Sequence, residues 1–185
     1  MFDDQPIFAF RGKRTYLSAT TVFDWLLQQL DSPTNIDFQF HQFTKNQCKV
    51  VSKTSLEDQI VATYRSNEEK LYLVDTEVAI DSNYPCNEQL IVGKAKISIE
   101  SGHFEMPPIE NASYIESIVV IYKEMLSKTE DGGRGKLIFG RVKLNRVPET
   151  GQCEVRHRRK IGDKFFEATL FCNDEKIGAL YFGQH

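Results

Sequence analysis

An internal repeat constrains this sequence more than any other feature. The segment 47–50 (QCKV) recurs at 152–155 (QCEV), an offset of 105 residues. Ala-Thr and Asn-Glu-Glu-Lys within 62–70 recur as Ala-Thr and Asn-Asp-Glu-Lys within 168–176, an offset of 106 residues. Because both blocks fall in the same order at nearly the same offset, the sequence predicts two copies of one structural unit.

Each copy is predicted to contain one central helix. In the first copy, residues 20–30 place apolar side chains at helical spacing, and the two threonines at the start can cap the helix. In the second copy the same spacing runs over residues 109–126, with Asn111 or Ser113 at its start. The glycines within 131–133 are expected to stop this second helix.

Strands are predicted before and after each helix, because β-prone residues alternate with polar ones between turn-forming clusters. Such clusters lie at 149–151, 162–163 and 173–174. An antiparallel sheet buries one face and one helix can cover that face, so the pattern predicts an α+β fold. The expected strands are 7–10, 36–43, 47–53, 59–65 and 71–80 in the first copy, and 89–100, 136–146, 153–161, 164–172 and 178–182 in the second.

The two copies are expected to meet at residues 81–87, a polar segment that contains proline. This predicts an N-terminal unit at residues 1–82 and a C-terminal unit at 88–185. A unit of half this length is small for a core of its own. The two units are therefore expected to dock into one pseudo-dimeric body.

Charge and cysteine usage exclude several classes of protein. The net charge of −3 argues against a basic surface for nucleic acid or an anionic membrane. No apolar run approaches the roughly 20 residues that span a bilayer, and the acidic N-terminus lacks the features of a signal peptide. The four cysteines form no CxxC pair and the four histidines show no metal-ligand spacing. No metal and a cytoplasmic location with reduced thiols are expected.

The second copy also carries a recognisable motif. Residues 97–116 read ISIESGHFEMPPIENASYIE, which resembles the β-hydroxyacyl-acyl-carrier-protein dehydratases of the hot-dog superfamily. The Gly-His-Phe of 102–104, the Met-Pro-Pro of 106–108 and Glu116 stand where that family has its histidine motif, its turn and its helix acid. The segment 136–155 resembles the strands that follow. Through the repeat, the resemblance implies a tandem (double) hot-dog fold, with two antiparallel sheets joined into one long sheet and each wrapped on a central helix.

The resemblance implies a substrate and a pair of catalytic groups. Hot-dog dehydratases act on acyl thioesters of acyl carrier protein or coenzyme A without a cofactor. Such a reaction needs a base and an acid across an apolar tunnel, and the two come from opposite units. Aligning the helices pairs His103 with Asp24 in one site and Glu116 with Arg11 in the other. Arginine cannot act as a base at ordinary pH, so the first pair is the expected catalytic one.

Several residues are expected to bind or polarise the substrate. The resemblance assigns contacts with the substrate to Gly102, Phe104 and Pro108, and Arg11, which comes before a helix, could contact a phosphate of a pantetheine-linked substrate. Pro108 also marks a departure, because the family has a glycine near this turn whose N–H can polarise a thioester carbonyl, and proline has no N–H. Asp24 lies within an apolar helix pattern, which favours a buried carboxylate with a perturbed pKa; it could instead mark the polar edge of the helix.

Three functions follow from this pattern. A β-hydroxyacyl-thioester dehydratase, a lyase, is expected first because of the sequence around His103. An acyl thioesterase is the second hypothesis, because hot-dog thioesterases use a helix Asp or Glu to activate water. The third is a non-catalytic acyl-binding or interaction module that kept the fold, in which His103 is a strand-end histidine bound to a backbone carbonyl. A homodimer is compatible with each of them.

Overall fold

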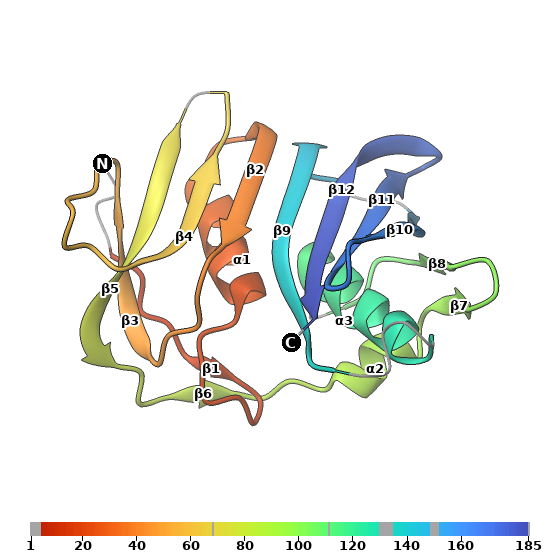
Figure 1. Ribbon diagram of the computed structural model, residues 1–185, viewed down its shortest axis with the longest axis horizontal. Helices are drawn as coiled ribbons and strands as arrows, with labels where there is room; N and C mark the ends of the chain where they lie inside the picture. Colours follow the sequence, from red (N-terminus) through yellow and green to blue (C-terminus); the bar gives the residue numbers. More distant parts are fainter. Residues whose placement is uncertain (1–4, 68, 111, 130–134, 149–151, 185) are drawn as a thin grey trace.

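A computed structural model of the chain describes residues 5–67, 69–110, 112–129, 135–148 and 152–184. One antiparallel sheet of ten strands runs through the molecule, and the two longer helices lie on the same face of it (Figure 1). Among the described residues no helix is long and apolar enough to cross a membrane. The expected helix stop at 131–133 and the turn at 149–151 lie outside the described residues.

The ten strands follow one another across the sheet in an order that differs from their order in the sequence. From one edge to the other they are β3 (Asn46–Val51), β5 (Lys70–Ala79), β4 (Ile60–Arg65), β2 (Thr34–Phe40), β9 (Leu137–Arg146), β12 (Glu175–Gln184), β11 (Phe165–Cys172), β10 (Cys153–Ile161), β8 (His103–Met106) and β7 (Lys96–Ser98). Two further short strands, β1 (Phe10–Arg11) and β6 (Asn83–Tyr84), pair in parallel outside this sheet.

The two predicted central helices are confirmed, with changed starts. Helix α1 spans Ala19–Gln29 and is preceded by Ser18 rather than capped by a threonine. Helix α3 spans Tyr114–Ser127, and Ser113 caps it by accepting a hydrogen bond from the Glu116 N–H. The helix predicted from residue 109 thus begins five residues later. The Pro-Pro turn and Ile109 lead into the helix instead of forming its first turn.

Most of the predicted strands are confirmed within a few residues, but two are wrong. The segment 7–10 contributes only its last residue to β1. The segment 89–100 forms helix α2 (Glu88–Val92) followed by the short strand β7. Asn87 explains the helix, because its side chain accepts a hydrogen bond of 3.4 Å from the Leu90 N–H and caps the first turn.

The two halves of the chain meet at the centre of the sheet, where β2 pairs with β9. The large antiparallel sheet with helices on one face makes the fold α+β, as the sequence predicted. The strand order of the halves differs, however. In the second half the last strand, β12, lies beside β9, whereas in the first half β4 lies beside β2 and β5 lies one position further out. The sequence repeat is therefore not matched by an identical strand order.

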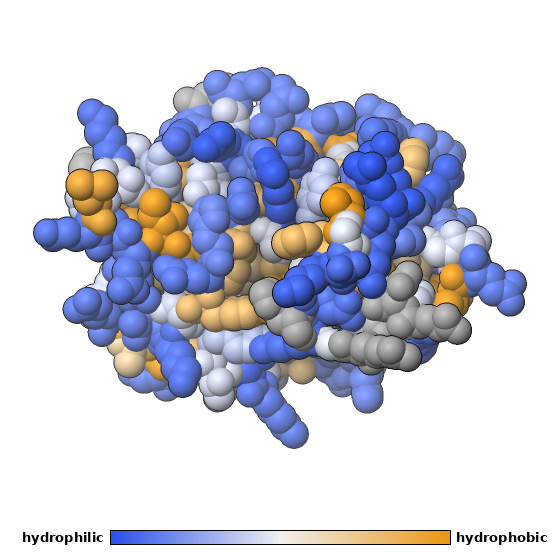
Figure 2. All heavy atoms as spheres, viewed as in Figure 1, coloured by the Kyte–Doolittle hydropathy of each residue, from blue (hydrophilic) through white to orange (hydrophobic). Residues whose placement is uncertain are grey.

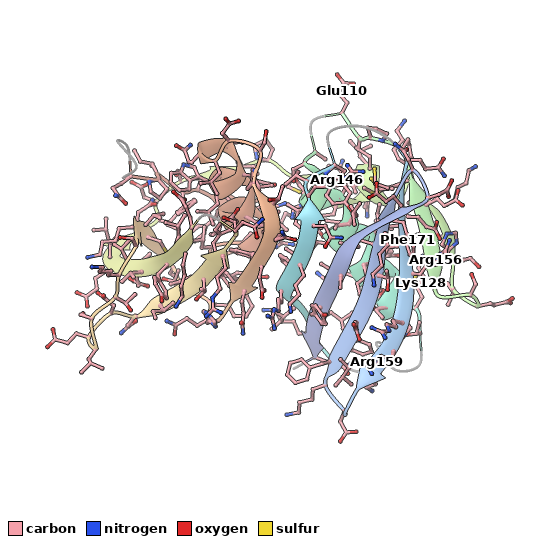
Figure 3. The ribbon with its side chains drawn as sticks, turned by 90° about the horizontal axis from the view of Figure 1, so that it is seen from above. Glu110, Lys128, Arg146, Arg156, Arg159 and Phe171 are labelled. Carbon is pink, nitrogen blue, oxygen red and sulfur yellow. The ribbon has the colours of Figure 1, made fainter. Side chains whose placement is uncertain are left out.

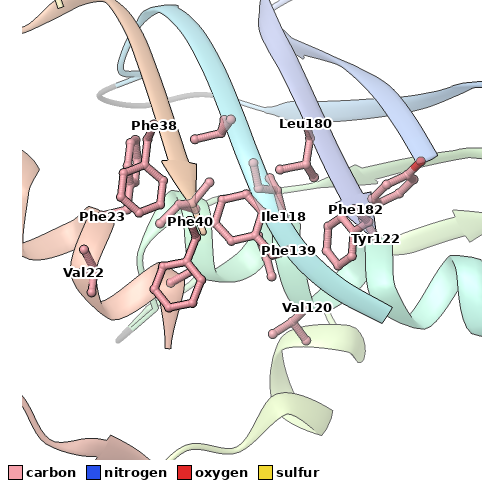
Figure 4. Close-up of a cluster of buried hydrophobic side chains, with 14 of the residues drawn as sticks. Val22, Phe23, Phe38, Phe40, Ile118, Val120, Tyr122, Phe139, Leu180 and Phe182 are labelled. Carbon is pink, nitrogen blue, oxygen red and sulfur yellow. The ribbon is translucent and has the colours of Figure 1, made fainter. Parts of the chain in front are cut away.

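A row of aromatic side chains joins the halves into one core (Figure 4). Phe23 of α1 packs against Phe38 of β2, with ring centroids 5.2 Å apart. Phe38 stacks on Phe139 of β9 at 6.3 Å, and Phe139 contacts Phe182 of β12 at 6.0 Å. Phe182 in turn meets Tyr122 of α3 at 5.3 Å. The row runs from one helix to the other, so the two halves share a continuous hydrophobic core.

The opposite face of the sheet carries charged side chains over much of its second half. Glu167 of β11 accepts hydrogen bonds from Arg158 at 3.0 Å and from Arg159 at 2.7 Å. Arg156 pairs with Glu154 on β10. Arg156 and Arg159 both belong to this charged surface (Figure 3). The sheet thus has an apolar face against the helices and a face with ion pairs on the other side.

Candidate functional site

A cavity of about 430 Å³ lies where the start of α3 meets α1. One wall comes from α1, a second from the first turns of α3 and the segment before it, and the rest from the ends of β8, β9 and β10. Most of the lining is apolar, as expected for a site that holds a chain of methylene groups. The lining residues are Phe23, Asp24, Leu27, Gln28, Met106, Pro108, Ile109, Ala112, Ser113, Tyr114, Ile115, Ser117, Val147, Pro148 and Cys153.

Asp24 supplies the carboxyl group of this cavity. It is half-buried on α1, and its Oδ2 accepts a hydrogen bond of 2.7 Å from the Ser113 hydroxyl. The same Ser113 oxygen accepts the N–H of Glu116, 3.0 Å away. One serine therefore caps α3 and fixes a carboxyl group that belongs to the other half of the chain.

The surroundings of Asp24 favour its neutral form. The pKa of Asp24 is raised to about 7, mainly by burial and to a smaller extent by the nearby charge of Glu116. The hydrogen bond from Ser113 and the charge of Arg11 act in the opposite direction but do not outweigh burial. The sequence predicted a perturbed carboxylate at this position, and that prediction is confirmed. Near neutral pH, Asp24 can both accept and release a proton.

Beside Asp24 lies a buried ion pair between Arg11 and Glu116. Arg11 comes from β1 and Glu116 from the first turn of α3, so this pair also joins the two halves. The Arg11 Nε donates to the Cys86 sulfur at 3.1 Å, and its Nη1 donates to the Thr20 hydroxyl at 3.4 Å. The predicted pairing of Glu116 with Arg11 is confirmed. Arg11 is buried within this cluster and is not among the residues that line the cavity, so it does not reach a phosphate at the surface.

The expected pair of His103 and Asp24 does not form. On β8, Phe104 and Met106 are buried toward the helices, so His103 points to the opposite face of the sheet. There the His103 Nε2 lies 3.0 Å from a carboxylate oxygen of Glu154, while Asp24 lies on the helix side. A proton therefore cannot pass directly between the two predicted partners.

Of the other predicted substrate-binding residues, Gly102 lies in a turn and Phe104 in the core, and only the third, Pro108, lines the cavity. Gly102 has a positive φ of 61° in the turn between β7 and β8, and a Cβ there would come within 3.0 Å of the His157 Cβ. Phe104 is fully buried in the core. Pro108 does line the cavity. As a proline, this residue offers no N–H to the cavity.

Comparison with known proteins gives matches only at the level of structure. No protein-family model matches the sequence, and no curated protein matches it. A candidate thioesterase from Novosphingobium aromaticivorans is 10% identical, with 95% of this chain and 90% of that chain covered and a TM-score of 0.46. A candidate oleoyl thioesterase from Lactobacillus plantarum is 6% identical, with 98% and 94% covered and a TM-score of 0.48.

A third match is the dehydratase domain of PpsC from Mycobacterium tuberculosis, solved with C12:1-CoA. It is 8% identical, covers 92% of this chain and 85% of that chain, and has a TM-score of 0.47. All three structures have TM-scores below 0.5 and are at most 10% identical to this chain.

Three residues of the cavity wall were not predicted from the sequence to be part of a functional site. Ser113 was expected only as a helix cap, and its bond to Asp24 depends on how the two helices cross. Tyr114 lines the cavity with a buried hydroxyl, and burial raises its pKa well above the ordinary value. Cys153 lies in the QCEV repeat, and burial raises its pKa to about 12. The repeat indicated that this cysteine is equivalent to the cysteine of QCKV in the first copy, but it did not indicate a cavity.

Within the described ranges, no group of three or more His, Cys, Asp or Glu side chains is placed to hold a metal ion. The Asp24 carboxyl, the Ser113 hydroxyl and the N-terminus of α3 are polar groups of the cavity wall that can take part in chemistry.

Proposed function

We propose that this chain hydrolyses acyl thioesters, with Asp24 as the general base and the apolar cavity as the site of the acyl chain. The observation that carries the proposal is the position of Asp24. Its carboxyl group stands on the wall of an apolar cavity, fixed by Ser113, with a pKa of about 7. A base whose pKa lies near the working pH is efficient, because much of it is ionised and it still accepts a proton readily.

The reaction follows from these groups. The Asp24 carboxylate removes a proton from water, and the oxygen of that water attacks the thioester carbonyl carbon. The tetrahedral intermediate collapses, the carbon–sulfur bond breaks, and the proton held by Asp24 passes to the leaving thiolate. The products are a free carboxylic acid and the thiol of the carrier, either coenzyme A or acyl carrier protein.

The N-terminus of α3 can stabilise the oxyanion of this intermediate. The first N–H groups of a helix have no acceptor within the helix, and the helix dipole favours negative charge at that end. Tyr114 and Ile115 begin α3 and line the cavity. Pro108 cannot donate an N–H, so we assign the donor role to the first turn of α3.

Hydrolysis is favoured over dehydration because Asp24 is a suitable base and no second acid of suitable strength is present among the described residues that line the cavity. A dehydratase needs a group that protonates the leaving hydroxyl, and His103 lies on the other face of the sheet. The raised pKa values of Tyr114 and Cys153 make both groups weaker acids than usual. Water activation by Asp24 requires neither of them.

The experiment is an assay of the full chain with acyl-CoA substrates of several chain lengths, in which free thiol and enoyl product are followed separately. Thiol release is expected, and Asp24→Asn should lower kcat by about 10²–10⁴-fold. Asp31→Asn, just beyond the end of α1, is the matched control and should retain full activity. Enoyl product without thiol release would contradict hydrolysis and favour a dehydratase.

Non-catalytic acyl binding is the alternative, and the observation that favours it is Pro108 on the cavity wall, where the family provides an N–H donor. In that case acyl-CoA would bind without turnover. A binding measurement with the same substrates, made beside the assay, separates this outcome from a protein that does not recognise acyl thioesters at all.

We also infer that the chain is a tandem hot-dog, with residues 1–82 and 88–185 as its units. The repeat blocks support this, because QCKV lies on β3 and QCEV begins at the start of β10, the first strand after β2 and after β9 respectively. The central pairing of β2 with β9 also relates equivalent strands of the two units. The changed order of β4 and β5 is then a rearrangement within the first unit.

A further inference from the structure

A second and larger cavity, of about 770 Å³, lies on the face of the sheet that the helices leave uncovered. It is formed where the ends of β2, β9 and β12 approach the hairpin between β10 and β11. Figure 2 shows apolar atoms in a hollow near the middle of this face. Cavities of about 300–1,000 Å³ are the usual size for small-molecule sites. No step of the proposed hydrolysis uses this cavity.

The cavity gathers several of the apolar side chains that the structure leaves exposed. Phe165 is 57% exposed, Phe43 43% and Ile161 39%. All three line this cavity, together with Ile138 and Tyr181. Elsewhere on the same face, β10 and β11 carry ion pairs such as that of the exposed Arg159 with Glu167. A concentrated apolar hollow on an otherwise charged face is typical of a binding site.

Arg141 and Lys136 both line the cavity, but they differ in whether a carboxylate neutralises their charge. Arg141 donates two hydrogen bonds to Asp37, of 2.8 and 2.5 Å, so its charge is neutralised locally. Burial opposes ionisation of Asp37, but Arg141 holds the pKa of that carboxyl below its usual value. Lys136 instead lies over the rings of Tyr16 and Phe43, at 4.8 and 5.1 Å from their centroids. Among the described residues, no carboxylate forms a salt bridge with Lys136, which leaves one positive charge beside the apolar hollow.

From this combination we propose that the cavity binds an amphipathic carboxylate, such as a long-chain fatty acid anion. The chain lies against Phe43, Ile161 and Phe165, and the carboxylate meets the ammonium group of Lys136. Burying the chain removes exposed apolar surface from water, and the charge of the ligand matches that of Lys136, a lining cation with no salt bridge to any described residue. The site is separate from Asp24, and its occupation does not depend on hydrolysis. The acid released by thioester hydrolysis belongs to the same chemical class.

The test is a nuclear magnetic resonance titration of the full chain with dodecanoate, below its micelle concentration. Saturable shifts are expected at the backbone amides of Gly140, Ile161 and Phe165. Lys136→Glu should weaken this binding by about tenfold, the effect of losing one charge pair. Lys70→Glu is the matched control and should leave it unchanged, because Lys70 also lies over a ring, that of Tyr72 at 4.7 Å, but does not line the cavity.

Three results would overturn the proposal. Shifts confined to Ala112 and Ser117 would place the chain only in the cavity beside Asp24. Equal affinity for dodecanol and dodecanoate, unaltered by Lys136→Glu, would remove the role of the charge. Shifts at Gly140 and Phe165 that change with protein concentration in the absence of dodecanoate would show that a second copy of the chain covers the hollow instead.

Discussion

The Ser113 hydroxyl donates a hydrogen bond of 2.7 Å to the Asp24 carboxyl and thereby joins the start of α3 to the middle of α1. This bond lowers the pKa of Asp24, although burial raises it more. It also connects the two halves of the chain at the wall of the cavity. This contact orients the Asp24 carboxyl, the proposed base, toward the cavity in which a thioester can lie.

Removing that hydroxyl should change the pH dependence of hydrolysis. In Ser113→Ala the pKa of Asp24 rises further, so the pH at which activity reaches half its maximum should move to a higher value. The variant also loses the helix cap, which lowers the free energy of unfolding by about 1 kcal/mol. Ser113→Thr retains a hydroxyl and should behave like the parent. A shift of equal size in Ser113→Thr would show that the hydroxyl is not the cause.

Asp24 should also reduce the stability of the protein at high pH. The pKa of its carboxyl is about 7 in the folded state and 3.8 in the reference state, so the folded protein binds more protons between these values. The contribution of Asp24 to the free energy of unfolding therefore falls as pH rises from about 4 to about 7. At pH 8, Asp24→Asn should be more stable than the parent by about 1–3 kcal/mol, after allowance for partial exposure.

Denaturant unfolding at pH 4 and pH 8 measures this effect. The difference between parent and Asp24→Asn should be near zero at pH 4 and should appear by pH 8. Other carboxylates such as Asp37 have lowered pKa values and contribute with the opposite sign, but they are common to both proteins and cancel. A variant that is less stable than the parent at pH 8 would show that the charged form of Asp24 is stabilised rather than strained.

The Arg11–Glu116 pair should be important for stability because both partners are shielded from water. Arg11→Met leaves Glu116 without its cation and should lower the free energy of unfolding by about 3–5 kcal/mol. Arg14→Met is the matched control. It breaks the more exposed pair of Arg14 and Glu88, at 2.5 Å, and should cost less than about 1 kcal/mol. Equal losses in the two variants would contradict the buried character of the first pair.

His103 should be dispensable for hydrolysis. Its side chain is on the face of the sheet opposite Asp24 and contacts Glu154. His103→Ala is therefore expected to change kcat/KM by less than about twofold, since no contact with substrate or base is removed. The same assay with acyl-CoA measures this. A loss comparable to that of Asp24→Asn would return His103 to the active site and restore the dehydratase hypothesis.

The helices, most strands and the buried ion pair could be predicted because they depend on local pattern and on pairing of the two copies. The apolar pattern around Asp24 favoured a buried carboxylate with a perturbed pKa, and the alignment of the helices paired Glu116 with Arg11. Both features are present. Predicting these two features required only the internal repeat and the helical spacing of apolar residues, and both can be read directly from a sequence.

The family motif predicts His103 on the helix side of the sheet, whereas strand alternation predicts the face on which it lies. In HFEM, the apolar Phe104 and Met106 alternate with His103 and Glu105, so the period of two puts the histidine on the face away from the helices. The strand order of the first half could not be predicted in this way. Whether β4 or β5 pairs with β2 depends on long-range contacts that leave no local pattern.

The pH dependence of kcat/KM for acyl-CoA hydrolysis tests the central claim most directly. With Asp24 as the base, log kcat/KM should rise with pH at a slope near one, level off above a pKa of about 7, and lose this limb in Asp24→Asn. A limb that persists in Asp24→Asn, or activity that is already maximal at pH 5, would contradict the assignment of Asp24 as the catalytic base.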